Sequence, residues 1–143
     1  GIIIALLITA WHVTFSPKPL PELKLVLWCG VVGLVGETLL AQTGILTYEG
    51  THIHPGGTTW WLLAMWVLFG SFINSLMRFL KGHYVWAALL GAVGGPLAYI
   101  PGGNLGALSF TNTFCAGVVI GLLWAVAMPI LIKLSNKYDG NKL

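Results

Sequence analysis

The sequence contains very little charge. Only 8% of its 143 residues are Asp, Glu, Lys or Arg and 57% are hydrophobic, whereas about 25% of the residues of a typical soluble domain are charged. So few charged residues cannot cover the surface of a protein that is surrounded by water. The composition therefore excludes an ordinary soluble domain and indicates an integral membrane protein.

Cysteines and catalytic signatures are also scarce. Two cysteines are too few for a disulfide framework. The sequence has no G-x-S-x-G elbow, H-E-x-x-H helix, phosphate-binding loop or dinucleotide-binding fingerprint. These absences disfavour catalysis, and no residue pattern indicates a cofactor. The seven basic residues lie at the ends of apolar segments rather than in one patch, so we expect no nucleic-acid partner.

Apolar stretches that approach the roughly 20 residues needed to cross a bilayer make up most of the chain. Segments rich in proline, glycine or polar residues separate them, such as SPKPLPEL and LTYEGTHIHPGG. We therefore predict an all-α fold, a single transmembrane helical bundle over residues 1–143. Its expected spans are about 1–15, 24–45, 58–81, 84–101 and 113–134. The first is short, so we expect it to be a partial span.

Lys and Arg residues flank alternate connections, and cytoplasmic loops of membrane proteins are enriched in both residues. The second and fourth connections contain neither residue. The first and third connections and the C-terminal tail contain all of them: Lys18, Lys24, Arg78, Lys81, Lys133, Lys137 and Lys142. This pattern predicts a cytoplasmic C-terminus. A further helix before Gly1 would restore a cytoplasmic N-terminus and give six spans in the full chain.

Glu37 is the only carboxylate that we expect to be buried in a span. At 1.5 Å per residue it lies about 20 Å from the cytoplasmic end of the second span, past the midplane. A bare carboxylate at that depth would cost several kcal/mol, so it must be protonated, paired or face a polar cavity. Two interpretations stay open, a functional site and a buried hydrogen bond between helices.

Asn74 and Arg78 lie one turn apart on the same face of the third span, and Ser71 precedes them on that face. Arg78 is close enough to the cytoplasmic end to extend to the headgroups, and its depth makes a direct pair with Glu37 unlikely. The stripe indicates either a hydrogen bond between helices or a site that faces polar headgroups.

Paired glycines predict close helix packing. Gly91 and Gly95 form one small-xxx-small pair, and Gly117 and Gly121 form another. Such pairs let helix backbones approach each other in a bilayer. We favour packing within one bundle, and a homodimer contact is the alternative.

Pro96 follows two glycines directly, and it predicts a kink or break in the fourth helix. Broken helices mark binding sites in transporters, although a single one is more often structural. In the outer loop, His52 and His54 are weak candidates for a metal site. Zinc requires three or four ligands, so we predict no metal there.

The third and fourth spans resemble a known family. The stretch WWLLAMWVLFGSFINSLMRFL contains the pattern W-x-x-x-A-x-W-x-x-F followed by Asn74, and GAVGGPLAY and LGALSF follow it. This combination is similar to the uncharacterised bacterial inner-membrane family known as domain of unknown function 2878. The similarity covers about residues 25 to 110, and GGPLAY is its most specific block. Glu37 in GETLLAQTGIL matches the family's acidic position, whereas Asn104 stands where many members have Arg.

This resemblance implies a multi-pass protein of the bacterial inner membrane with a further N-terminal helix, and it implies no established activity. Family members often accompany lipid-modifying genes. We therefore favour a non-catalytic accessory protein or complex subunit linked to envelope lipids. The alternatives are a small transporter that uses Glu37 and a broken fourth helix, and a membrane-embedded lipid-modifying enzyme. The expected partners are membrane lipids and either other membrane subunits or a second copy.

Overall fold

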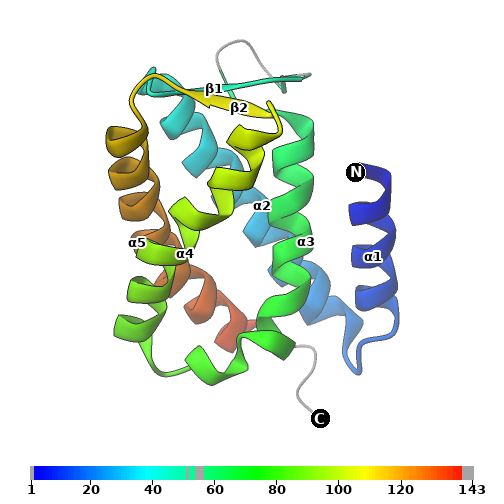
Figure 1. Ribbon diagram of the computed structural model, residues 1–143. Helices are drawn as coiled ribbons and strands as arrows, with labels where there is room; N and C mark the ends of the chain where they lie inside the picture. The colour runs from blue at the N-terminus through cyan, green and yellow to red at the C-terminus, as the bar shows by residue number, and fades with distance from the viewer. Residues whose placement is uncertain (1, 51, 54–56, 140–143) are drawn as a thin grey trace.

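Figure 1 shows a computed structural model of the protein, which describes residues 2–50, 52–53 and 57–139, with the backbone alone for Leu76. Within these ranges five α-helices lie side by side as a bundle. They are α1 (Ile2–Thr14), α2 (Pro19–Gln42), α3 (Trp60–Leu76), α4 (Tyr84–Asn104) and α5 (Thr113–Lys137). A short 3-10 helix, η1 (Arg78–Leu80), joins α3 to α4. The predicted helical bundle is therefore confirmed.

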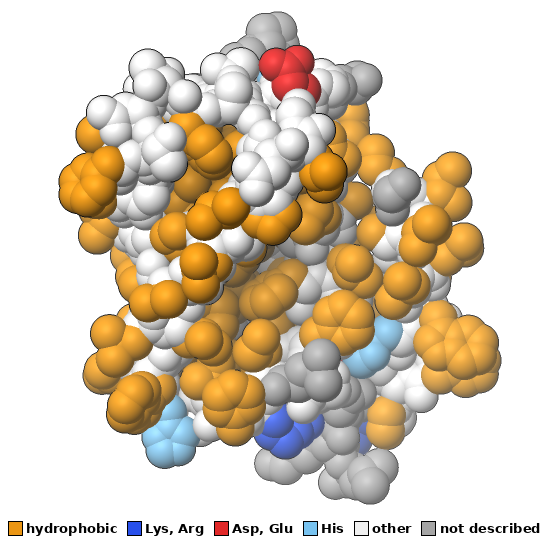
Figure 2. Space-filling view, viewed as in Figure 1, with side chains coloured by type: hydrophobic (Ala, Val, Ile, Leu, Met, Phe, Trp, Pro, Cys, Tyr) orange, Lys and Arg blue, Asp and Glu red, His pale blue; other side chains and the backbone are white. Residues whose placement is uncertain are grey.

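Three of these helices, α2, α4 and α5, are long and apolar enough to cross a membrane. The other two are apolar but shorter, with 13 residues in α1 and 17 in α3. Large hydrophobic side chains cover the outer surfaces of the helices (Figure 2). Such surfaces suit contact with lipid, because hydrophobic side chains need not be buried inside the protein when the surroundings are themselves apolar.

The fold also contains a small sheet that the all-α prediction missed. Strands β1 (Leu46–Tyr48) and β2 (Leu108–Phe110) pair antiparallel at one end of the bundle (Figure 1). Each strand follows a helix that ends near a glycine with positive φ, Gly44 at 72° and Gly106 at 78°. The chain turns sharply at each glycine, and the aromatic and β-branched residues that follow extend and pair.

Two predicted boundaries were wrong because prolines are tolerated in places where we expected them to end helices. Helix α2 begins at Pro19 rather than near residue 24. The first N–H groups of a helix have no partner within the helix, so a proline there loses nothing. Helix α4 continues through Pro96 and Pro101 to Asn104, so of the predicted kink or break at Pro96 the break does not occur, and the kink stays a prediction. Pro96 removes one hydrogen bond, to the carbonyl of Ala92, and packing against α5 retains the helix.

The helices form two groups. Helix α3 packs mainly on α2 and α1, and α4 packs mainly on α5. A Cβ atom on Gly91 or Gly95 would overlap Trp124 of α5, and one on Gly121 would lie 3.0 Å from the carbonyl oxygen of Ala92. Three of the four glycines singled out in the sequence thus lie at the α4–α5 contact. Gly117 differs, because a Cβ atom there would meet no described atom within 4 Å.

Candidate functional site

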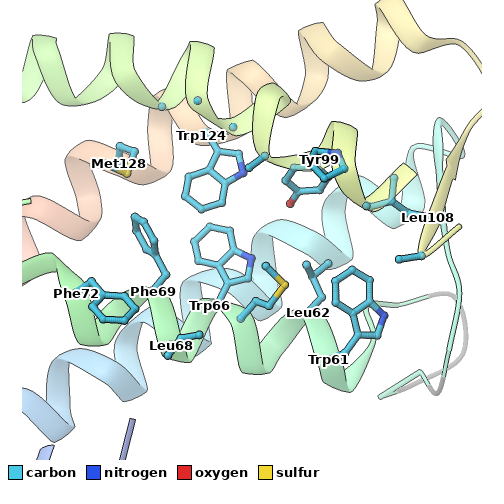
Figure 3. Close-up of a pocket in the computed structure, with 18 of the residues that line it drawn as sticks. Trp61, Leu62, Trp66, Leu68, Phe69, Phe72, Tyr99, Leu108, Trp124 and Met128 are labelled. Atoms are coloured by element: carbon cyan, nitrogen blue, oxygen red, sulfur yellow. The ribbon is translucent and has the colours of Figure 1, made fainter. Parts of the chain in front are cut away.

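Helices α3 and α4 make few direct contacts, and a groove of about 680 Å³ lies between them. Trp124 and Met128 of α5 form part of its wall, and Figure 2 shows the molecule hollowed on this face. Side chains from both helices project into the groove (Figure 3). The residues that line it are Trp61, Leu62, Met65, Trp66, Leu68, Phe69, Phe72, Met77, Leu90, Gly91, Gly94, Gly95, Ala98, Tyr99, Pro101, Gly102, Leu105, Ala107, Leu108, Trp124 and Met128.

The described lining of the groove is apolar and contains no charged residue. Aromatic rings meet at its centre, where Trp66 and Trp124 stack with their ring centroids 4.4 Å apart (Figure 3). Phe69 contacts Trp124 edge-on at 5.6 Å. Such offset and edge-to-face arrangements stabilise aromatic clusters beyond the area that they bury. The groove therefore has a rigid aromatic centre and suits a hydrocarbon ligand.

Glu37 lies directly behind this lining and is 1% exposed. Its carboxylate accepts hydrogen bonds from the Tyr48 hydroxyl at 2.5 Å, from Trp66 Nε1 at 2.8 Å and from the Tyr99 hydroxyl. Trp66 and Tyr99 also line the groove. These two side chains thus present their rings to the groove and their polar atoms to Glu37.

The two carboxylate oxygens have enough acceptor sites for all three donors. The donors join α2, which carries Glu37, to β1, α3 and α4. Burial, the nearby charge of Glu37 and the hydrogen bond to it raise the pKa of Tyr48 above its usual value. Tyr48 therefore remains a neutral donor. The recorded partners of Glu37 are all neutral, so the buried carboxylate is held by hydrogen bonds rather than by an ion pair.

The structure brings Asn74 to a second buried carboxylate. Glu22 is 0% exposed and accepts hydrogen bonds from His12 Nε2 at 2.9 Å and Asn74 Nδ2 at 2.6 Å. The expectation that Glu37 is the only buried carboxylate was therefore wrong. Glu22 escaped notice because the second span was predicted to begin after it, whereas it lies in the first turn of α2.

Arg78 pairs with Asp139, which follows α5. Its two terminal nitrogens lie 2.9 and 3.1 Å from the two carboxylate oxygens. Lys81 Nζ donates to Asp139 Oδ2 at 2.7 Å and to Asn74 Oδ1 at 2.7 Å, which joins this ion pair to the Glu22 cluster. Burial alone would raise the pKa of Asp139, but the hydrogen bonds and charges of Arg78 and Lys81 lower it below its usual value.

Ser71 belongs to the same stripe but lies deeper. It is 0% exposed, and its Oγ lies 3.3 Å from Oγ1 of Thr9 in α1. The face predicted from the spacing of Ser71, Asn74 and Arg78 thus points toward α1, α2 and the end of α5.

His52 lies apart from both clusters. His52 Nδ1 donates to the carbonyl of Gly57 at 2.9 Å. His54 lies outside the residues that the structure describes. Within the described ranges, no three His, Cys, Asp or Glu side chains are grouped as metal ligands.

Sequence reasoning identified Glu37 but not its three donors. Two of them were already visible in the quoted motifs, because Trp66 is the second tryptophan of W-x-x-x-A-x-W-x-x-F and Tyr99 ends GGPLAY. Nothing in the sequence links them to Glu37, from which they lie 29 and 62 residues away along the chain.

These motifs belong to a family whose sequence model matches residues 1–130 of the chain and is described as "Protein of unknown function (DUF2878)". Comparison with curated proteins and with solved structures finds no match. The match covers both motifs, all three donors and both buried carboxylates. The chain belongs to the DUF2878 family of proteins of unknown function.

Proposed function

We propose that this protein is a non-catalytic accessory protein of the bacterial inner membrane that binds the hydrocarbon part of a lipid between α3 and α4. The observation that carries the proposal is the uncharged, aromatic groove of about 680 Å³. Its volume falls within the roughly 300–1,000 Å³ of typical small-molecule sites. Both helices that border it present hydrophobic side chains to their surroundings, so a lipid chain could enter sideways.

The length and the apolar lining of the groove suit a lipid chain. The groove extends along α3 from Trp61 to Met77, which is roughly 24 Å at 1.5 Å per residue. Because lipid tails are as apolar as the lining, binding would rest on close packing and aromatic contacts rather than on the hydrophobic effect.

The site supports the two alternative functions less well. A transporter that uses Glu37 would need a polar path to it, whereas an apolar lining and three bound donors separate Glu37 from the groove. A lipid-modifying enzyme would need a nucleophile or an acid–base group that faces its substrate. The described lining offers only indole and phenol groups.

Blocking the groove tests the proposal. A Cβ atom on Gly94, which lines the groove, or on Gly117, which does not, meets no described atom within 4 Å. Gly94→Leu should therefore fill the groove, and Gly117→Leu is the matched control. Native mass spectrometry of gently solubilised protein should show bound lipid on the wild type and on Gly117→Leu, and several-fold less on Gly94→Leu.

Two results would overturn this proposal. One is a wild-type protein that carries no lipid under conditions in which it remains folded. The other is equal lipid retention by the wild type and Gly94→Leu. The same spectra would reveal a co-purifying membrane subunit or a second copy of the chain, which are the other partners that we propose.

A further inference from the structure

Arg78 lies between two apolar hollows. Met77, the residue before it, lines the groove, whereas Phe79 and Leu80, the residues after it, line a second hollow of about 550 Å³. Leu90 of α4 lines both hollows. Arg78 thus lies in the chain between a residue that lines the groove and two residues that line the second hollow.

The side chains around Arg78 already bind an anion of suitable geometry. Two Arg78 nitrogens and Lys81 Nζ contact the two carboxylate oxygens of Asp139 at 2.7 to 3.1 Å. Arginine binds carboxylate and phosphate through the same fork of parallel N–H groups. The Asp139 carboxylate therefore occupies the position that two phosphate oxygens would take.

Exposure and charge favour an external anion at this place. The Arg78 side chain is 45% exposed, whereas those of Lys81 and Asp139 are 13% and 8% exposed. Among the described residues, Arg78 and Lys81 both contact the carboxylate of Asp139. Figure 2 shows a small area of Lys or Arg at the lower edge of the hollowed face, the end of the bundle at which η1 lies in Figure 1.

We propose that Arg78 and Lys81 bind the phosphate of an anionic phospholipid whose two acyl chains lie in the two hollows. Asp139 competes with the phosphate for the two cations and so weakens binding of the lipid. This inference rests on the proposed lipid groove and adds the headgroup, the number of chains and an inhibitory contact within the chain itself.

The test compares lipids that differ only in one part. Purified full-length protein is incubated with phosphatidylglycerol, with phosphatidylcholine of the same acyl chains and with single-chain lysophosphatidylglycerol, and bound lipid is counted by native mass spectrometry. We expect several-fold more phosphatidylglycerol than either of the others on the wild type. Glycerol phosphate, which has no acyl chain, should not displace it at equal concentration.

Three variants identify the site. Arg78→Gln should lose the preference for phosphatidylglycerol while retaining total lipid, and Asp139→Asn should retain several-fold more phosphatidylglycerol than the wild type. Lys133→Gln, which removes an exposed positive charge elsewhere on α5, should behave as the wild type. Because Asp139→Asn is expected to increase binding, it tests the inference even if Arg78→Gln fails to fold.

The inference is overturned if the wild type shows no preference for phosphatidylglycerol, or if Asp139→Asn leaves its retention unchanged. Equal binding of the single-chain lipid, or displacement by glycerol phosphate, would overturn it as well. If lipid is retained without a headgroup preference and Gly94→Leu abolishes that retention, the proposed lipid groove is supported and only the proposed headgroup site is contradicted. If no lipid is retained at all, both proposals fall.

Discussion

Trp66 and Tyr99 each connect two environments that a membrane protein normally keeps apart. Their rings line an apolar groove, while their polar atoms bond to a buried carboxylate. A Trp or Tyr that is buried in an apolar region needs a partner for its polar atom. Glu37 supplies that partner for both residues at once. The carboxylate is therefore what permits two large aromatic residues at the centre of the groove.

Replacing Glu37 by Gln should destabilise the protein. The amide has the same shape, but its NH₂ group would face at least one of the donors that now bond to the carboxylate. A buried donor left without an acceptor costs about 1–3 kcal/mol. We expect a lower thermal unfolding midpoint in detergent, measured by intrinsic fluorescence, than that of the wild type.

Glu49→Gln is the control for this prediction, because Glu49 is an exposed residue after β1. It should unfold at the wild-type temperature. If Glu37→Gln also unfolds at that temperature and retains lipid as the wild type does, Glu37 has neither the structural role described above nor a functional one.

The sequence predicted that Glu37 is buried and that it lacks a charged partner at its depth. Its donors could not be predicted, because they lie 11, 29 and 62 residues away along the chain. Such pairs depend on which helices pack together, and hydropathy does not contain that information. Asp139 was missed for the same reason, since its partner Arg78 lies 61 residues away.

At the scale of the elements, the contact between α4 and α5 depends on glycine at particular positions. Gly91 and Gly95 lie against Trp124, and Gly121 lies against the carbonyl of Ala92. Small residues are the usual means of close helix approach in membranes. Gly94 lines the groove, as Gly91 and Gly95 do, but a Cβ atom there would meet no described atom within 4 Å. Two neighbouring turns of α4 thus use glycine for different reasons.

Alanine substitutions distinguish a glycine that close helix packing requires from one that it does not. Gly91→Ala would place a methyl group against the Trp124 backbone, which cannot move without displacing α5, and overpacking of this kind costs about 1–3 kcal/mol. Gly94→Ala meets no described atom and should leave the stability unchanged or slightly raised. Thermal unfolding of both variants checks the prediction, and equal midpoints would contradict it.

The lengths of the apolar stretches predicted where the helices lie, but they did not predict the residues at which the helices begin and end. Proline was expected to end a helix near Pro19 and to kink or break one at Pro96, yet Pro19 begins α2 and Pro96 lies inside α4. The strands β1 and β2 were missed because each has three residues and pairs with a segment about 60 residues away. A strand this short has no period of its own that a sequence could reveal.

At the scale of the whole molecule, the basic connections meet at one end. The α1–α2 connection, η1 and the end of α5 lie at the lower end in Figure 1, opposite the strands. This arrangement agrees with the Lys and Arg distribution, which predicts that this end is cytoplasmic. The strand end would then face the outside.

The two cysteines allow a direct test of this orientation. Cys115 is exposed in the first turn of α5, near the strand end, and Cys29 is buried in α2. A membrane-impermeant maleimide added to intact spheroplasts should label the wild type and should not label Cys115→Ser. Labelling that requires permeabilised membranes would contradict the predicted orientation.

The division of the helices into two groups has a consequence for the groove. Trp66 belongs to the α1–α2–α3 group and Tyr99 to the α4–α5 group, and both are attached to the same carboxylate. If the groups move apart to admit a bulky chain, the bond between Tyr99 and Glu37 must stretch. The groove would therefore favour slender, unbranched chains over branched ones. The interaction that selects between them would be the Tyr99–Glu37 hydrogen bond, which lies behind the lining and which neither kind of chain touches.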